Sequence, residues 1–295
     1  MSGLALVFSG QGMQHPQMLP WLDEQRIVEM PGWRKALEDP AWAARNANAQ
    51  PLLTAVSLAA WQDLVPLLPR PEAVAGYSVG ELAAFAVAGV FDAQTARALA
   101  VQRAAAMDRC PAGGLVAVSG LAPDAIEALC TATACHVAIE NGFDAVVLGG
   151  PREALAAMQT QAEAAGAHCT PLRVEVPSHT PAMQPAAEAF AALLAGLPLR
   201  APTVPLFSNA SGERLWNAPQ AAHALAAQIA RTVRWAACMD QIHARRVTCV
   251  LEIGPGAALA RLWNQRHPDV PARSVDEFRS VAAIVAWVAR QTRQG

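Results

Sequence analysis

Short apolar runs that lead through a glycine-containing turn into a helical pattern recur along this chain. One run spans residues 4–8, a second spans residues 73–77 before a helical pattern that stops at Gly89, and a third spans residues 250–253 before a Gly-Pro-Gly turn. Short runs made mostly of apolar residues are typical of buried strands, and such turns after parallel strands line ligand crevices. We therefore expect a parallel sheet covered by helices.

A different order of elements occupies residues 114–175. The patterns there read strand, helix, strand, strand, helix, strand, at residues 115–120, 123–132, 135–142, 145–150, 152–166 and 169–175. This is the split β-α-β order of a ferredoxin-like unit. We expect it to form a small α+β subdomain inserted into a larger domain made of residues 1–113 and 176–295.

The turn after residues 73–77 places one serine, Ser78, between Gly76 and Gly80. A G-x-S-x-G sequence between a strand and a helix is typical of the nucleophile elbow, in which small flanking residues let the backbone pass close to its neighbours. The following helix aims its amide groups at the place where an oxyanion forms during acyl transfer. The pattern predicts an α/β fold with a large α/β-hydrolase-like domain, but by itself it fits a structural turn equally well.

His179 is the candidate base for this serine. Among the seven histidines it is the one at the end of an expected strand, which we extend to Pro177, and a helical pattern follows it. A structural histidine would give the same local pattern. With an ordinary pKa of ~6.5, such a base would make acylation fall on acidification through that range.

No acidic residue sits in an obvious position for the triad of the common hydrolases, whose chain order is serine, acid and then a histidine near the C-terminus, and His179 lies over a hundred residues from the end of the sequence. The helical segment expected at residues 221–235 carries Gln228 instead. An amide or a main-chain carbonyl can also orient an imidazole, with less charge stabilisation than a carboxylate supplies.

Composition and charge narrow the function classes. The chain has 295 residues, 53% of them hydrophobic, and a net charge of −2, so no basic face for nucleic acid is expected. Six cysteines without a CxxC pair, and an N-terminus without a basic segment before an apolar core, favour a reducing cytoplasm. Glycines and Glu81 interrupt the apolar run around Ser78, so we expect no membrane segment. We also expect no metal site.

Five motifs together carry a resemblance to a known family. They are FSGQGMQ, GYSVGELAAFAVAGV, Arg103 in an Ala-rich helix, VPSHTPAMQPAA and LEIGPGAAL. In order and approximate spacing they resemble the malonyl-CoA:acyl carrier protein transacylase family, over about residues 4–262. The chain departs from the family pattern at Ser9, where relatives often have proline, at Met13 within the GQG turn, and at Tyr77, which replaces the usual histidine before the nucleophile.

The resemblance implies a role for each matching residue. Ser78 corresponds to the nucleophile and His179 to the base. Arg103 corresponds to the arginine that binds the free malonyl carboxylate, and its planar fork suits a bidentate carboxylate better than a lysine would. The other matches are the oxyanion-binding amides of Gln11 and Val79, the carbonyl of Gln228 that orients the histidine, and Asn141 near the substrate cleft.

The resemblance also implies the reaction. A malonyl group would pass from malonyl-CoA to the prosthetic-group thiol of an acyl carrier protein, by a ping-pong mechanism through a malonyl-serine ester. No bound cofactor is expected, because the CoA thioester and the carrier's phosphopantetheine-type arm are substrates. Tyr77 makes the chain most similar to the malonyl transferase (epsilon) subunit of malonate decarboxylase, which would add other subunits of that system as partners. The alternatives are fatty-acid or polyketide synthesis, a serine esterase or thioesterase, and a non-catalytic subunit that only docks a carrier.

Overall fold

The larger of the two sheets in the structure, a computed structural model that describes residues 3–293, has the strand order β10-β9-β1-β2-β7-β8. Neighbouring strands are parallel except β7 and β8, which are antiparallel. The parallel sheet expected from the apolar runs is therefore confirmed. Its strands are β1 (Leu4–Phe8), β2 (Ala73–Gly76), β7 (Leu206–Phe207), β8 (Arg214–Leu215), β9 (Cys249–Ile253) and β10 (Ala272–Ser274).

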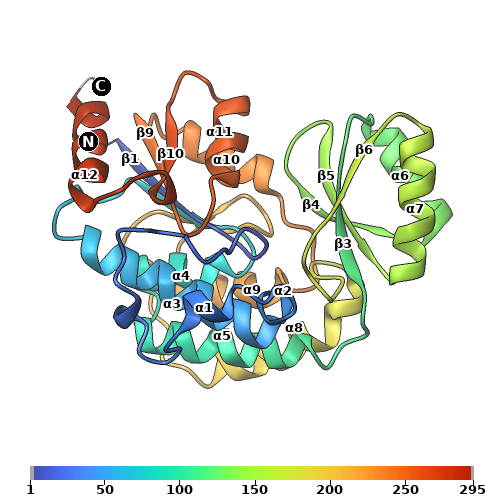
Figure 1. Cartoon of the computed structure of the whole chain (residues 1–295), viewed down its shortest axis with the longest axis horizontal. Coiled ribbons are helices and arrows are strands. Elements are labelled where there is room, and N and C mark those ends of the chain that lie inside the picture. The colour runs from blue at the N-terminus through green and yellow to red at the C-terminus, as the bar shows by residue number, and fades with distance from the viewer. Residues whose placement is uncertain (1–2, 294–295) are drawn as a thin grey trace.

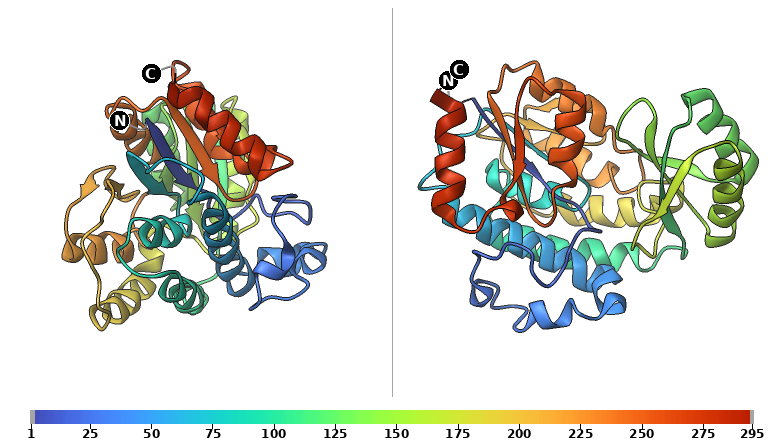
Figure 2. Two further views of the ribbon diagram at one scale, coloured as in Figure 1. Left: turned by 90° about the vertical axis from the view of Figure 1, so that its left-hand side faces the viewer. Right: turned by 45° about the horizontal axis from the view of Figure 1, so that its top comes forward.

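Helices cover both faces of this sheet (Figures 1 and 2). Along β1, Leu4 and Leu6 point into the core on one face, and Ala5 and Val7 point into the core on the other. The first core contains side chains of α3 (Asn46–Leu64), α4 (Gly80–Val87), α5 (Ala93–Met107), α8 (Gln184–Ala195), α9 (Ala218–Ala227) and α12 (Val281–Arg293). The second contains those of α10 (Trp235–His243) and α11 (Ala258–Arg266). Burial on both faces explains why the strands lack polar alternation.

The smaller sheet has the order β4-β5-β3-β6, and all its neighbours are antiparallel. Two helices pack on one of its faces in a separate core, while side chains on the other face join the second core of the larger sheet. Figure 1 shows this unit, in green, beside the larger one. The ferredoxin-like order is confirmed. The elements are β3 (Gly114–Ser119), α6 (Pro123–Thr133), β4 (His136–Glu140), β5 (Ala145–Gly150), α7 (Arg152–Ala164) and β6 (His168–Pro171).

Shorter helical elements complete residues 3–293. The α-helices are α1 (Trp33–Ala36) and α2 (Pro40–Ala44), and the 3-10 helices are η1 (Glu24–Arg26), η2 (Pro181–Met183) and η3 (Val275–Glu277). No helix within this range is long and apolar enough to cross a lipid bilayer.

Two expected elements are wrong in extent. The strand expected to end at Pro177 is too long, because β6 ends at Pro171 and the segment that follows forms local hydrogen bonds, from Val174 N to Leu172 O and from Ser178 N to Val176 O, both at 2.9 Å. Such two-residue bonds turn the chain and use groups that a ladder needs.

The helix expected over residues 221–235 is also too long, since α9 ends at Ala227. Beyond it, the amide of Val233 donates to Ala138 O at 2.9 Å, and Val233 O accepts from the amide of Glu140 at 2.8 Å. Pairing with the edge strand β4 therefore replaces the last helical turns.

Candidate active site

Ser78 lies at a sharp turn between β2 and α4, as the sequence predicts. Its φ is 55°, in the left-handed region that non-glycine residues rarely adopt. A side chain at Gly76 would overlap the backbone of Gly80 and Glu81, and one at Gly80 would overlap the carbonyl of Phe8. The two glycines therefore allow the close backbone approach that holds this serine in a strained turn.

His179 lies directly against the serine. Its Nε2 is 2.8 Å from Ser78 Oγ, and its Nδ1 is 2.5 Å from the main-chain carbonyl of Gln228. A carbonyl oxygen only accepts, so Nδ1 carries the proton and Nε2 presents a lone pair to the serine hydroxyl. Gln228 thus orients the imidazole through its backbone, while its side chain contacts Arg103.

The His179 imidazole is held neutral. It is 1% exposed, and burial, together with the positive charge of Arg103, lowers its pKa from 6.5 to about 3 against the opposing effect of the Gln228 carbonyl. The pKa of His179 is therefore well below the ordinary histidine value from which the acid limb was expected. The lone pair on Nε2 is available throughout the neutral range.

Two backbone amides beside Ser78 are free of internal partners. Val79 is the N-cap of α4, and Gln11 lies in the turn after β1, where its side chain donates to Ala44 O at 3.1 Å. Neither amide donates to another residue within 3–293. Unpaired backbone amides suit a developing negative charge, and the amide of Val79 adds the positive end of the α4 dipole.

Arg103 reaches the same place from α5, and it is 1% exposed. Nη1 donates to Gln50 Oε1 at 2.7 Å, and Nη2 lies 3.4 Å from Ser78 Oγ and 3.3 Å from Gln228 Oε1. The guanidinium has no ion-pair partner in the described part of the chain. Burial lowers its pKa from 12.5 to about 10, so it is a charged group without a counter-ion at neutral pH.

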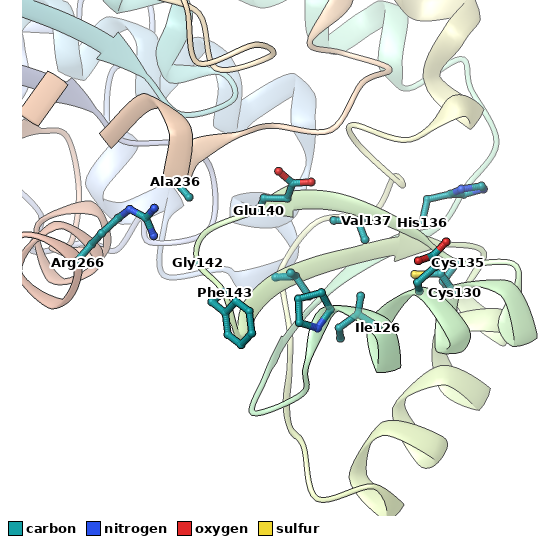
Figure 3. Close-up of a pocket in the computed structure, with 13 residues that line it drawn as sticks. Ile126, Cys130, Cys135, His136, Val137, Glu140, Gly142, Phe143, Ala236 and Arg266 are labelled. Carbon is teal, nitrogen blue, oxygen red and sulfur yellow. The ribbon is translucent and has the colours of Figure 1, made fainter. Parts of the chain in front are cut away.

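These groups surround a small chamber of about 30 Å³. A second cavity of about 560 Å³ includes His179 and extends to the exposed Arg231 and Arg234. The cavity in Figure 3, about 580 Å³, lies between α6, β4 and the following turn and contains none of the residues named above as candidates. The chamber is lined by Gln11, Gln50, Tyr77, Ser78, Arg103, Leu115, Ile139, Leu172, Val174, Ser178 and His179.

Asn141 does not line this chamber. Its Oδ1 accepts a hydrogen bond from the hydroxyl of Tyr77 at 3.1 Å. Of the other departures, Ser9 donates to the buried Glu252 at 2.9 Å, and Met13 is 41% exposed beside the turn at Gly256.

Two buried polar residues near the site were missed from the sequence. Gln50 holds Arg103, and its signal is a large polar residue among the mostly apolar buried positions of α3. Glu81, fully buried on α4, accepts from the amide of Asn209 at 2.7 Å, and burial raises its pKa from 4.5 to about 8. Glu81 forms no ion pair with Arg103, although the positive charge of Arg103 lowers the pKa of Glu81 and the carboxyl group raises the pKa of Arg103.

Sequence comparison defines the class of the protein. The model of the acyl transferase domain family matches residues 38–293, and the chain belongs to this family of acyltransferases. It is 34% identical to a malonyl CoA-acyl carrier protein transacylase of Mycobacterium bovis, over 92% of this chain and 96% of the relative.

Solved structures agree with this family. A crystal structure of FabD from Acinetobacter baumannii has a TM-score of 0.86 and 29% identity, covering 98% of this chain and 99% of that one. A malonyl-transacylase solved with a type II PKS acyl-carrier protein has a TM-score of 0.84 and 29% identity, covering 96% and 99%.

Proposed function

We propose that this acyltransferase moves malonyl groups from CoA to an acyl carrier protein through an ester on Ser78. The observation that carries the proposal is the buried, unpaired guanidinium of Arg103, 3.4 Å from Ser78 Oγ. A malonyl group bears a carboxylate one methylene away from its reacting carbonyl, so a cation beside the nucleophile matches it. An acetyl group would leave that charge buried and unpaired.

In the first half-reaction Ser78 attacks the thioester carbonyl, and Nε2 of His179 takes the hydroxyl proton. An oxygen–carbon bond replaces the carbon–sulfur bond, and His179 returns the proton to the departing CoA sulfur. The amides of Gln11 and Val79 stabilise the intermediate oxyanion. The carbonyl of Gln228 keeps the imidazole in the tautomer that both proton transfers require.

In the second half-reaction the carrier thiol loses its proton to His179 and attacks the malonyl ester. The carbon–oxygen bond breaks, and the proton returns to Ser78. The prosthetic arm approaches through the cavity that reaches His179 from Arg231 and Arg234. Their exposed positive charges suit the phosphates of CoA and of a phosphopantetheine-type arm.

The carrier is that of fatty-acid or polyketide synthesis in this proposal. Relatives named as malonyl CoA-acyl carrier protein transacylases, and the likeness to a transacylase solved with a PKS carrier, support this choice. The narrower assignment to malonate decarboxylase rests on Tyr77 and on the short length of the chain. The free cysteines fit a cytoplasmic reaction.

Incubation with labelled malonyl-CoA, followed by mass spectrometry of peptides, tests the mechanism. We expect the label on Ser78 in the wild type and no label in Ser78→Ala. Rapid transfer to a carrier thiol with no acyl-enzyme would contradict the proposal. Hydrolysis of short esters as fast as thiol transfer would favour an esterase, and transfer only to a carrier with the dephospho-CoA-derived arm would restore the malonate decarboxylase assignment.

A further inference from the structure

The side chain of Gln50 fixes the guanidinium of Arg103. Gln50 lies on α3, which packs against the helix α5 that carries Arg103, and it is 1% exposed. Its Oε1 accepts a hydrogen bond from Nη1 of Arg103 at 2.7 Å, and its Nε2 donates to Sδ of Met107, also on α5, at 3.5 Å. Because a guanidinium only donates, the carboxamide oxygen is the atom that faces Arg103.

The side chains that hydrogen-bond to the guanidinium are uncharged. Besides Gln50, they are Gln228, whose Oε1 lies 3.3 Å from Nη2, and Ser78, whose Oγ lies 3.4 Å from the same nitrogen. The charge of Glu81 raises the pKa of Arg103, but the two residues form no ion pair. These contacts therefore orient the cation beside the nucleophile without supplying a counter-ion.

A carboxamide and a carboxylate at position 50 would differ in charge but hardly in shape. The Oε1 atom of Gln50 is 2.7 Å from Nη1, which is the distance of a close ion pair if the oxygen belongs to a carboxylate. A malonyl carboxylate would then meet a neutralised guanidinium and a second negative charge. An acetyl group, in contrast, would no longer leave a buried cation unpaired.

We propose that Gln50 is a specificity-determining residue, because its neutral carboxamide positions Arg103 beside Ser78 and leaves the positive charge available to a carboxylate on the acyl group. The inference rests on the proposed malonyl transfer. It assigns to α3 a part in the choice between acyl groups that carry a carboxylate and acyl groups that do not.

The test is the ratio of kcat/KM for malonyl-CoA over acetyl-CoA in Gln50→Glu. This variant keeps the size of the side chain and an oxygen acceptor for Nη1, so a purely structural role predicts an unchanged ratio. We expect the ratio to fall by roughly 10²-fold or more, because the buried cation has gained a permanent partner. Malonyl transfer should account for the loss, and acetyl transfer should stay the same or rise.

Two further variants separate charge from position. Gln50→Met removes the acceptor without adding a charge, and the loss of one hydrogen bond should keep the ratio within about tenfold of the wild-type value. Gln62→Glu is the matched control, because it makes the same substitution at an exposed position of α3, three turns from Gln50. It should leave the ratio unchanged.

Thermal unfolding of each variant is measured alongside the kinetics. Gln50→Glu should unfold at the wild-type temperature or above it, since the carboxylate pairs with a buried cation. A lower unfolding temperature overturns the proposal, because the guanidinium would then not face position 50 as an uncompensated charge. An unchanged ratio in Gln50→Glu overturns it too, and so does an equal fall in Gln50→Met.

Acylation of wild-type Ser78 by malonyl-CoA keeps this test apart from that of the proposed function. If the wild type is not acylated, the proposed malonyl transfer is overturned. If Ser78 is acylated and Gln50→Glu leaves the ratio unchanged, only the role of Gln50 is overturned.

Discussion

Replacing Arg103 with alanine separates a malonyl transferase from an esterase or a general acyltransferase. The guanidinium is 1% exposed, has no ion pair within residues 3–293, and lies 3.4 Å from Ser78 Oγ. Its pKa of about 10 indicates that burial disfavours the charge by several kcal/mol until a carboxylate arrives. Removing one partner of a buried charged pair costs about 3 kcal/mol or more, which is roughly a 10²-fold loss in rate constant.

The assay compares kcat/KM for malonyl-CoA and acetyl-CoA in the wild type and in Arg103→Ala. We expect malonyl transfer to fall by roughly 10²-fold or more, and acetyl transfer to stay the same or rise, because the buried charge that excludes acetyl groups is gone. Arg97→Ala is the matched control. Arg97 lies on the same helix α5, but it is partly exposed and pairs with Glu29 at 3.0 Å, so its loss should change neither rate.

The acetyl reaction also controls for structural damage. Arg103→Ala leaves Gln50 and Gln228 without a donor, and any resulting distortion of the Ser78 turn would lower both reactions together. A ratio of malonyl to acetyl kcat/KM that does not change would refute the reasoning, because the guanidinium would then make no contact with the substrate carboxylate.

Two predictions concern pH. The acid limb of kcat/KM for malonyl-CoA should lie well below pH 6.5, since the pKa of His179 is about 3. In Arg103→Ala this limb should move to higher pH, because a positive charge that repels the imidazolium is lost. A stopped-flow pH profile of the wild type with its limb at the ordinary histidine pKa would contradict this. The pKa of Glu81, raised from 4.5 to about 8, contributes stability that is present below the lower value and lost as pH rises through the higher one. The side chain in Glu81→Gln is neutral at every pH. The free energy of unfolding of this variant, measured in urea and compared with that of the wild type, should therefore increase by up to roughly 5 kcal/mol as the pH rises from 4.5 to about 8. An equal difference in unfolding free energy at the two pH values would disprove the effect.

The sequence by itself determined the local chemistry of the nucleophile turn. An apolar run, a serine between two glycines and a helical pattern are consecutive in the chain, and they form β2, the Ser78 turn and α4. The order of elements in the smaller sheet could be read in the same way, because each strand and helix shows its own periodicity. The roles of the Gln11 and Val79 amides, by contrast, came from the family resemblance of their motifs.

The ends of strands and helices beside irregular segments could not be predicted from the sequence. The stretch before His179 is apolar and reads as a strand, but its bonds within itself end β6 at Pro171. The end of α9 depended on Val233, whose pairing with β4 joins residues almost a hundred positions apart. A propensity pattern carries no information about such a partner.

Only the tertiary structure decided the protonation states of the groups in the site. His179 and the carbonyl of Gln228 are 49 positions apart, and their 2.5 Å contact selects the tautomer. Burial of His179, Arg103 and Glu81 in one place shifts all three pKa values, because desolvation and neighbouring charge depend on the surroundings in space. The sequence shows which ionisable residues are present, but their protonation at neutral pH depends on how the two sheets and the helices pack around Ser78.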